Sequence, residues 1–160
     1  MQSLLDGSAP RGTHACWRSH RLSTLPDPAI DRIVALVESI TSPLSLLNGW
    51  AIGGAVSRVA PGATALGARE PGFELRLIAV WPPGDHDSER HVAWVRDGWA
   101  TLQPFSAGAF PGFLSDEGVA GVRTAYGDRL PRLVALKDRH DPANVFRLNA
   151  NIPPSNGATR

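Results

Sequence analysis

Glu74-Leu75-Arg76-Leu77-Ile78-Ala79-Val80-Trp81 is the stretch that decides the fold, because it is the clearest β-strand in the sequence. It is followed by Pro82-Pro83-Gly84, through which neither a helix nor a central strand continues. Successive side chains of a strand point to opposite faces. One face therefore carries Leu75, Leu77, Ala79 and Trp81, and the other carries Glu74, Arg76, Ile78 and Val80. Apolar residues on both faces predict that the strand is covered on both sides over part of its length.

Two further strands are predicted N-terminal to this one. Residues 14–22 form an extended segment that is rich in aromatic and polar side chains. Residues 44–52 show the alternation of a strand, with Asn48 and Trp50 on one side and Gly49 and Ala51 on the other. Gly53-Gly54 then permits a bend or a bulge, and residues 60–71 are expected to form a loop.

Four helices surround these strands in the sequence. The first begins at Asp27, which is expected to cap it, and ends before Pro43, with an inward stripe of Ile30, Ile33, Val34, Val37 and Ile40. The second begins at Asp87 or Ser88 and ends before Pro104, with inward Val92, Val95, Trp99 and Leu102. The third begins at Ser115 or Asp116, and Asp128 caps the fourth. This order predicts an α+β fold, an antiparallel sheet covered by helices on one face.

Composition excludes several classes of function. The 160 residues are 42% hydrophobic and 19% charged, and the net charge of +1 offers no basic surface for nucleic acid. Cys16 is the only cysteine, so no intrachain disulfide or cysteine-rich metal site is expected. No apolar run is long enough to span a membrane, and the start of the chain lacks the features of a signal peptide, so we expect a cytoplasmic protein.

The residues alone give weak catalytic signals. Asp85, Asp87 and His91 resemble a metal cluster, but they lie at the expected start of a helix, where acidic residues act as caps, so no metal site is predicted. Gly53-Gly54 lacks the further residues of a phosphate-binding loop. Glu74 and Arg76 are candidates for binding substrate, although an outward-facing ion pair is an equally good interpretation.

The C-terminal segment carries a more specific signal. It contains Tyr126-Gly127, a Leu133 to Lys137 helix, Asp141-Pro142-Ala143-Asn144-Val145-Phe146-Arg147 and Asn149-Ala150-Asn151-Ile152-Pro153-Pro154. This pattern resembles the closing segment of berberine bridge enzyme-like FAD-linked oxidases. Trp17-Arg18-Ser19 and the segment from Phe73 to Trp81 are also similar to family sequences, and residues 53–59 resemble a Gly-Gly-Ala-Val family strand. The resemblance covers nearly the whole chain, but only about the last third of a full family member.

The resemblance implies a partial substrate domain that closes over FAD. In the family, hydride passes from a substrate carbon to the flavin, and oxygen reoxidises the flavin. The glycine-rich pyrophosphate loop and the histidine that bonds the flavin have no counterpart in the sequence. Asn149 and Asn151 are expected to contact the flavin ring. Phe110 stands where the family commonly has a tyrosine that acts as base or hydrogen-bond partner, so no catalytic residue is assigned.

The resulting interpretation divides the chain into three parts: residues 1–125 as a partial substrate-binding domain, residues 126–154 as the berberine-bridge-like segment and residues 155–160 as a disordered tail. We expect a C-terminal fragment of an FAD-dependent oxidoreductase that is inactive without an FAD-binding domain. Two alternatives remain open: a subunit that completes a separately encoded FAD domain, and a non-catalytic binding module that kept the fold. A small-molecule substrate is expected in the complete enzyme, and its identity is left open.

Overall fold

A three-stranded antiparallel sheet forms the centre of the molecule. The computed structural model describes residues 11–60, 62–67, 69–114 and 117–157. The strands are β1 (His14–Leu22), β2 (Leu46–Ile52) and β3 (Gly72–Trp81), in the order β1-β3-β2. Both neighbours pair antiparallel with β3, as the register Cys16↔Ala79 and Leu47↔Leu77 shows. The strand that was clearest in the sequence, β3, is therefore the central strand of the sheet.

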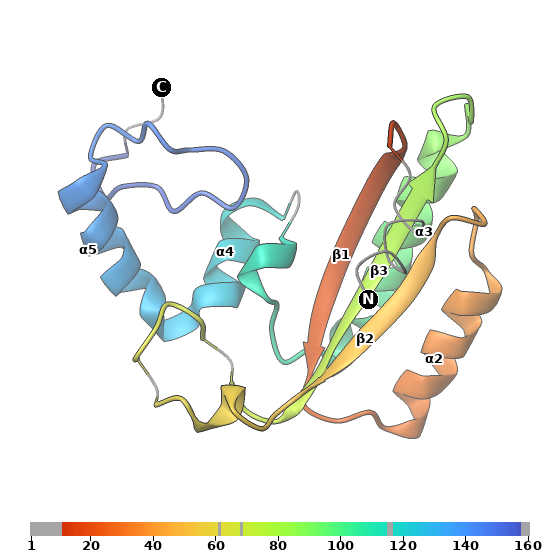
Figure 1. The fold of residues 1–160 in the computed structure, drawn as a ribbon, viewed down its shortest axis with the longest axis horizontal. Coiled ribbons are helices and arrows are strands. Elements are labelled where there is room, and N and C mark those ends of the chain that lie inside the picture. The colour runs from red at the N-terminus through yellow and green to blue at the C-terminus, as the bar shows by residue number, and fades with distance from the viewer. Residues whose placement is uncertain (1–10, 61, 68, 115–116, 158–160) are drawn as a thin grey trace.

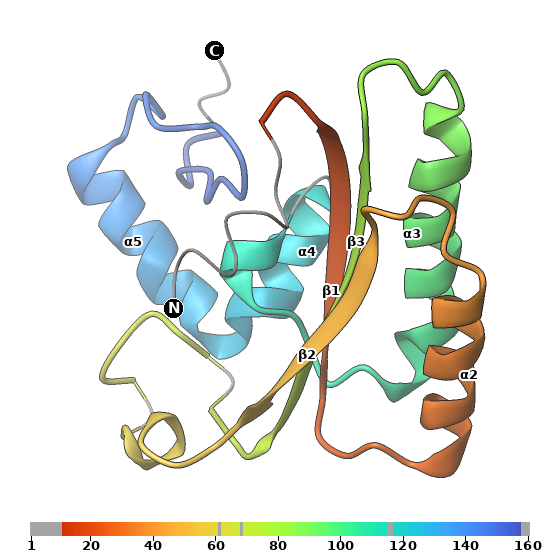
Figure 2. The ribbon, with the colours of Figure 1, turned by 45° about the vertical axis from the view of Figure 1, so that its right-hand side comes forward.

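Helices lie on both sides of this sheet. The helices α2 (Asp27–Glu38) and α3 (Ser88–Leu102) cover one face (Figure 1). On the other side lie α4 (Gly118–Tyr126) and α5 (Leu130–His140), as the turned view also shows (Figure 2). The expected α+β class, an antiparallel sheet covered by helices on one face, is confirmed, and the C-terminal pair of helices is an addition on the opposite side.

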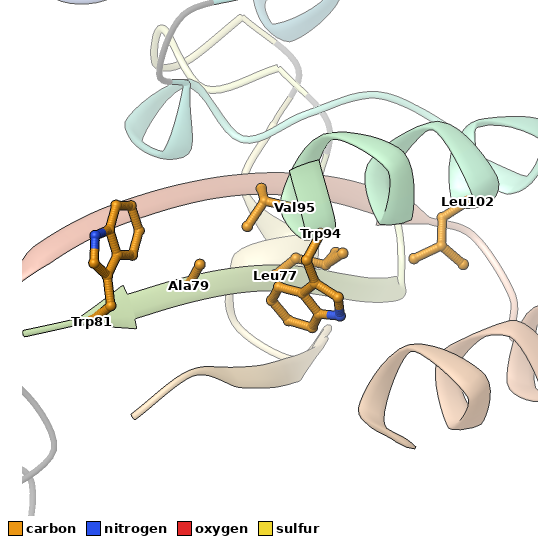
Figure 3. Close-up of a cluster of buried hydrophobic side chains, with 6 residues drawn as sticks. All are labelled: Leu77, Ala79, Trp81, Trp94, Val95 and Leu102. Carbon is orange, nitrogen blue, oxygen red and sulfur yellow. The ribbon is translucent and has the colours of Figure 1, made fainter. Parts of the chain in front are cut away.

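The main core lies between β3 and α3. Leu77, Ala79 and Trp81 point from the strand toward the helix residues Trp94, Val95 and Leu102 (Figure 3), and all six side chains are buried. Gly98 permits the close approach of the two elements, because a Cβ at this position would lie 2.7 Å from Leu36 Cδ2 and 2.7 Å from Leu77 Cδ2. Burying this face is the main stabilisation available to the sheet.

The inward face of α2 differs from the expected one. The helix is turned so that Ala29 is fully buried, while Ile33 and Leu36 pack against the core. Three residues of the predicted inward stripe are instead about half exposed: Ile30, Val34 and Val37. The prediction was wrong for these three because two apolar stripes run along this helix, and only packing decides between them. Asp27 is the first helical residue and makes no side-chain cap.

Two other segments also need correction. Residues 53–59 do not continue a strand: Gly54 has φ of +58° and a 3₁₀ turn, η1, follows at Val56–Arg58. Asp128 does not cap α5, because it lies in the 3₁₀ turn η4 (Gly127–Arg129) and the helix begins at Leu130. The predicted caps Ser115 and Asp116 of α4 lie outside the described residues. Among the described residues, no helix is long and apolar enough to cross a membrane.

Candidate functional site

The face of the sheet turned away from α2 and α3 carries two rows of polar and aromatic side chains. The register places Arg21, Glu74 and Trp50 side by side across the three strands. The next row along consists of Ser19, Arg76 and Asn48. Because side chains alternate along a strand, these rows lie on the face opposite Leu75 and Leu77.

A pocket lies over the first row. Its volume is about 300 Å³, and Arg21, Glu74 and Trp50 form its base. The segment after β2 contributes Val56 and Leu66, and the turn η3 (Pro111–Phe113) with the residues before it contributes aromatic rings. We call this the sheet-face pocket; its lining is Arg21, Trp50, Ile52, Val56, Leu66, Glu74, Ala109, Phe110 and Phe113.

Glu74 is a buried carboxyl group at the base of this pocket. The residue is 3% exposed, and Oε1 has no hydrogen-bond partner among the described residues. Burial raises the pKa of Glu74, while the Ser19 hydroxyl and the Arg21 guanidinium act less strongly in the opposite direction. The Ser19 hydroxyl is near enough to influence this pKa but lies outside hydrogen-bond geometry. The alternative of an outward ion pair with Arg76 is therefore wrong.

Arg76 stands behind the aromatic wall and does not line the pocket. Its Nε donates to Asn48 Oδ1 at 3.2 Å, and its guanidinium carbon lies 4.0 Å from the Trp50 ring centroid and 4.5 Å from that of Phe113. Burial lowers the pKa of Arg76. Its cation–π contacts hold the two rings in place, so of the two residues predicted to bind substrate only Glu74 faces the cavity.

Phe110 and Phe113 form the outer wall. The ring of Phe113 stacks on Trp50 with a centroid distance of 5.7 Å and meets Phe110 at 5.0 Å. Gly112 permits this arrangement, because a Cβ there would lie 2.7 Å from Phe110 Cε1. Phe110, which stands where a tyrosine was expected, thus places an apolar ring in the pocket. It has no proton to exchange.

The two candidate flavin contacts, Asn149 and Asn151, lie in the segment after α5 and line no part of the sheet-face pocket. Asn149 is exposed and has φ of +59°, a conformation that asparagine tolerates better than most residues. Asn151 is half-buried, and its Oδ1 is a buried acceptor with no hydrogen-bond partner in the described part of the chain. The structure therefore leaves one of these two asparagines with unused hydrogen-bonding capacity.

Asp141 organises this C-terminal segment. Its carboxylate accepts from the backbone N–H of Val145 at 2.8 Å and of Phe146 at 3.1 Å. Lys137 Nζ donates to the same carboxylate and to the Phe146 carbonyl oxygen, and the Lys137 hydrogen bond is the largest cause that lowers the pKa of Asp141. As a result Phe146, which is 82% exposed, is held outward rather than packed.

The end of the described chain also returns to α5. Ser155 donates to Asp138 through its backbone N–H and its hydroxyl, both at 2.7 Å, and Asn156 donates to the Pro142 carbonyl oxygen at 3.1 Å. These contacts differ from the disordered tail expected from residue 155 onward. Residues 158–160 of that tail lie outside the described part of the chain.

The two buried histidines, His20 and His91, have structural partners. His20 is 1% exposed and lies 2.9 Å from Ser106 Oγ and 2.8 Å from the Trp99 carbonyl oxygen; burial lowers its pKa. His91 is bonded by Thr41 Oγ1 at 2.8 Å and Asp85 Oδ2 at 3.0 Å. Over the described ranges, no group of three or more candidate ligands could hold a metal ion.

The sequence interpretation missed Arg21, Trp50 and Phe113 as site residues. Arg21 and Trp50 are neighbours of Glu74 only through strand pairing, which a single sequence does not specify. One signal could have found them: in an antiparallel sheet, polar or aromatic residues that alternate on the same face as Glu74 are candidates for its cross-strand neighbours. Phe113 carried no signal, because η3 is an irregular connection.

The sequence and the fold of this chain are similar to those of known proteins. Residues 115–153 match the family described as berberine and berberine like. The chain is 30% identical over 152 residues to the FAD-linked oxidoreductase YgaK of Bacillus subtilis, covering 92% of this chain and 33% of that protein. The solved structure of the G164A variant of berberine bridge enzyme, described as a reticuline dehydrogenase, superposes with a TM-score of 0.74 at 16% identity, covering 88% of this chain and 33% of that one.

A second solved structure, the D396N variant of BBE-like 1 from Physcomitrella patens, gives a TM-score of 0.70 at 20% identity and covers 90% of this chain and 31% of that chain. The two structural matches show the same fold. This chain thus spans about a third of the length of the relatives it matches. Together, the matched segment, the sequence relatives and the shared fold show that the chain belongs to the berberine bridge enzyme-like FAD-linked oxidoreductases.

Proposed function

We propose that the protein supplies the substrate-facing part of an FAD-linked oxidase, in which the sheet-face pocket holds a small molecule and Glu74 receives its hydroxyl proton. The observation that carries the proposal is the unpartnered Oε1 of Glu74, buried at the base of an otherwise apolar pocket. A buried acceptor without a partner costs stability, and a binding role for it explains that cost.

FAD fits the described residues in part. Asn151 Oδ1 is a buried, unpartnered acceptor that suits a ring N–H of a flavin. No glycine-rich loop that could cradle a pyrophosphate is present in the sequence. When bound, FAD supplies the two-electron oxidation of the substrate carbon, with oxygen as the final acceptor. This chain would contact its ring, and another polypeptide segment would hold its phosphates.

Glu74 is suited to act as a general base. A raised pKa brings the carboxylate closer to the working pH, where proton acceptance in the transition state is most efficient. The Arg21 guanidinium beside it stabilises the ionised form before the proton arrives. Phe110 has no ionisable group, so this role falls to Glu74 rather than to the position where the family commonly has a tyrosine.

The partner in this proposal is a flavin-holding segment. The apolar side chains of Val145, Phe146 and Leu148 are 67%, 82% and 83% exposed, although Asp141 fixes the backbone there. Residues 126–154 then act as the docking segment and residues 1–125 as the partial substrate-binding domain. A preformed, exposed apolar segment lowers the cost of association.

The test is reconstitution. The chain is co-expressed with the part of the Bacillus subtilis relative that it does not match, and anaerobic loss of flavin absorbance is followed with aromatic alcohols, sugars and amines. We expect at least one class to bleach the flavin, and Glu74→Gln to slow bleaching by about 100-fold or more. The control Arg96→Ala changes a 53% exposed side chain on α3 and leaves the rate unchanged. A flavin-loaded complex that is bleached by none of these classes contradicts the proposal.

A second candidate function is a binding module without catalysis. It is favoured by the combination of an aromatic wall and a buried carboxyl group in the sheet-face pocket, which offers a ligand both apolar contacts and a hydrogen-bond acceptor. Ligand binding by the chain alone, together with a reconstituted complex that never transfers electrons, would favour this candidate over the oxidase.

A further inference from the structure

Two buried polar atoms on the sheet, Ser19 Oγ and Glu74 Oε1, have no hydrogen-bond partner among the described residues. Both residues are 3% exposed. In the register, Arg21 pairs with Glu74 and Ser19 pairs with Arg76, so Ser19 and Glu74 are diagonal neighbours on one face, within reach of a long side chain. Buried polar atoms are rarely left without a partner. Two of them at one place indicate a role that the two residues share.

Ser19 carries the one group beside Glu74 that can pass a proton on. Apart from burial, the pKa of Glu74 is influenced by the Ser19 hydroxyl, the guanidinium groups of Arg21 and Arg76, and a hydrogen bond from the backbone of Phe110. Guanidinium groups and backbone N–H groups only donate, so they accept no proton from a carboxyl group. A serine hydroxyl accepts through its lone pairs and also donates its own proton.

Ser19 also lines a second cavity, which Glu74 does not reach. This cavity has a volume of about 420 Å³ and is lined by residues of β1, α3, α4 and the segment that joins these two helices. We call it the β1-edge pocket, because β1 is an outer strand of the sheet. Its lining includes Arg18, Ser19, Gln103, Glu117 and Thr124. Ser19 therefore lies between the carboxyl group of one pocket and the interior of another.

The two pockets differ in their suitability for water. A buried water molecule needs about 10–15 Å³ of space and two to four polar partners. The β1-edge pocket offers the polar side chains of Arg18, Gln103 and Glu117, and Gln103 is exposed at its rim. In the sheet-face pocket only Glu74 and Arg21 have polar side chains, and a bound ligand displaces solvent there. The polar route from a ligand-covered Glu74 to solvent thus runs through Ser19.

From this arrangement we propose that Ser19 is a proton relay, which takes the proton from Glu74 after each oxidation and passes its own hydroxyl proton to water in the β1-edge pocket. The inference rests on the proposed function of Glu74 but concerns the step that follows it. First, the O–H bond of the substrate breaks and its proton binds to the Glu74 carboxylate. That proton then moves to Ser19 Oγ as the Ser19 hydroxyl proton moves to water, which restores an ionised Glu74 and a neutral serine.

The first experiment uses the 160-residue chain without FAD. The side-chain carboxyl carbon of Glu74 is titrated by NMR and assigned with Glu74→Gln. Because the Ser19 hydroxyl lowers the pKa of Glu74, Ser19→Ala should raise it above the wild-type value. Ser19→Ala removes a hydroxyl that has no partner among the described residues, so the variant should fold. The control Thr124→Val removes another hydroxyl of the β1-edge pocket, which donates to Ala120, and should leave the pKa of Glu74 unchanged.

The second experiment uses the flavin-loaded complex and separates the first turnover from later ones. It is run at a pH where Glu74 is ionised in every variant. Anaerobic bleaching needs only the first proton transfer, so Ser19→Ala should bleach within about twofold of the wild-type rate. Steady-state turnover in oxygen requires Glu74 to lose its proton each time, so Ser19→Ala should slow it by about tenfold or more. Thr124→Val should change neither rate.

The outcomes distinguish this inference from the oxidase proposal. An unchanged pKa of Glu74 in Ser19→Ala overturns the contact between the two residues and the relay with it. Normal bleaching with normal steady-state turnover in Ser19→Ala overturns the relay and leaves the oxidase proposal intact. Equal slowing of both rates also overturns the relay, because Ser19 would then act in the first proton transfer. A flavin-loaded complex that no substrate class bleaches removes both proposals.

Discussion

Replacing Leu77 with alanine should destabilise the protein strongly. Leu77 is 0% exposed on the central strand and packs in one cluster with Val95 and Leu102 of α3. The substitution removes three buried carbon atoms, which is worth about 2.4 kcal/mol of transfer free energy at about 0.8 kcal/mol each. The cavity left behind raises the expected loss to about 2–5 kcal/mol. At about 2–4 °C per kcal/mol for a chain of this size, the Tm should fall by about 4–20 °C.

The assay is thermal and urea unfolding followed by circular dichroism, with Leu136→Ala as the matched control. Leu136 lies on α5 and is 45% exposed, so the same chemical change there should alter the free energy of unfolding by no more than about 0.5 kcal/mol. Similar losses for the two variants would refute the reasoning, because the β3–α3 contact could not then be the main core.

Three further predictions concern polar groups. Glu74→Gln should raise the Tm at pH 7, and this gain should disappear below about pH 4. The pKa of Glu74 is raised in the folded state, so the folded wild-type protein binds more protons than the unfolded one. The stability of the wild-type protein therefore falls as the pH rises from about 4 toward the folded-state pKa, whereas glutamine does not titrate. A pH-independent gain in thermal melts across this range would contradict it. Thr41→Val should cost about 1–3 kcal/mol in urea unfolding, because it leaves His91 Nδ1 buried without a hydrogen-bond donor. Thr124→Val, at an exposed position of α4, should be nearly neutral, and equal costs for the two variants would argue against the buried hydrogen bond. Asp141→Ala should speed amide exchange at Val145 and Phe146, and Asp138→Ala only at Ser155; unchanged exchange in both would mean that these carboxylates do not hold the segment.

Much of the fold could be predicted because local patterns agreed with the tertiary packing. The alternation in β3 correctly grouped Leu75, Leu77, Ala79 and Trp81 on one face, and all four are buried. The proline and glycine positions gave the ends of β3 and α3 to within a few residues. Where two interpretations were locally equal, as for the two apolar stripes of α2, the sequence could not decide. Only packing against the core separates the exposed Val34 from the partly buried Leu36.

The site could be predicted only in part. Glu74 could be placed on the central strand because its position follows from the alternation of one strand, and its side chain lines the sheet-face pocket. Its partners Arg21 and Trp50 come from other strands, and their adjacency depends on register. Arg76 was grouped with Glu74 by the same alternation, yet the aromatic rings of Trp50 and Phe113 hold it away from the cavity. Pairings between distant segments of the chain therefore limit what one sequence can show.

The most direct test of the central claim is whether the chain alone retains FAD. The purified 160-residue chain is incubated with excess FAD and desalted, and its visible absorbance is recorded with and without the flavin-holding part of a relative. We expect a colourless chain that acquires flavin absorbance only together with that partner, because the sequence contains no glycine-rich loop that could hold the pyrophosphate of FAD. Stoichiometric retention of flavin by the chain alone would contradict it.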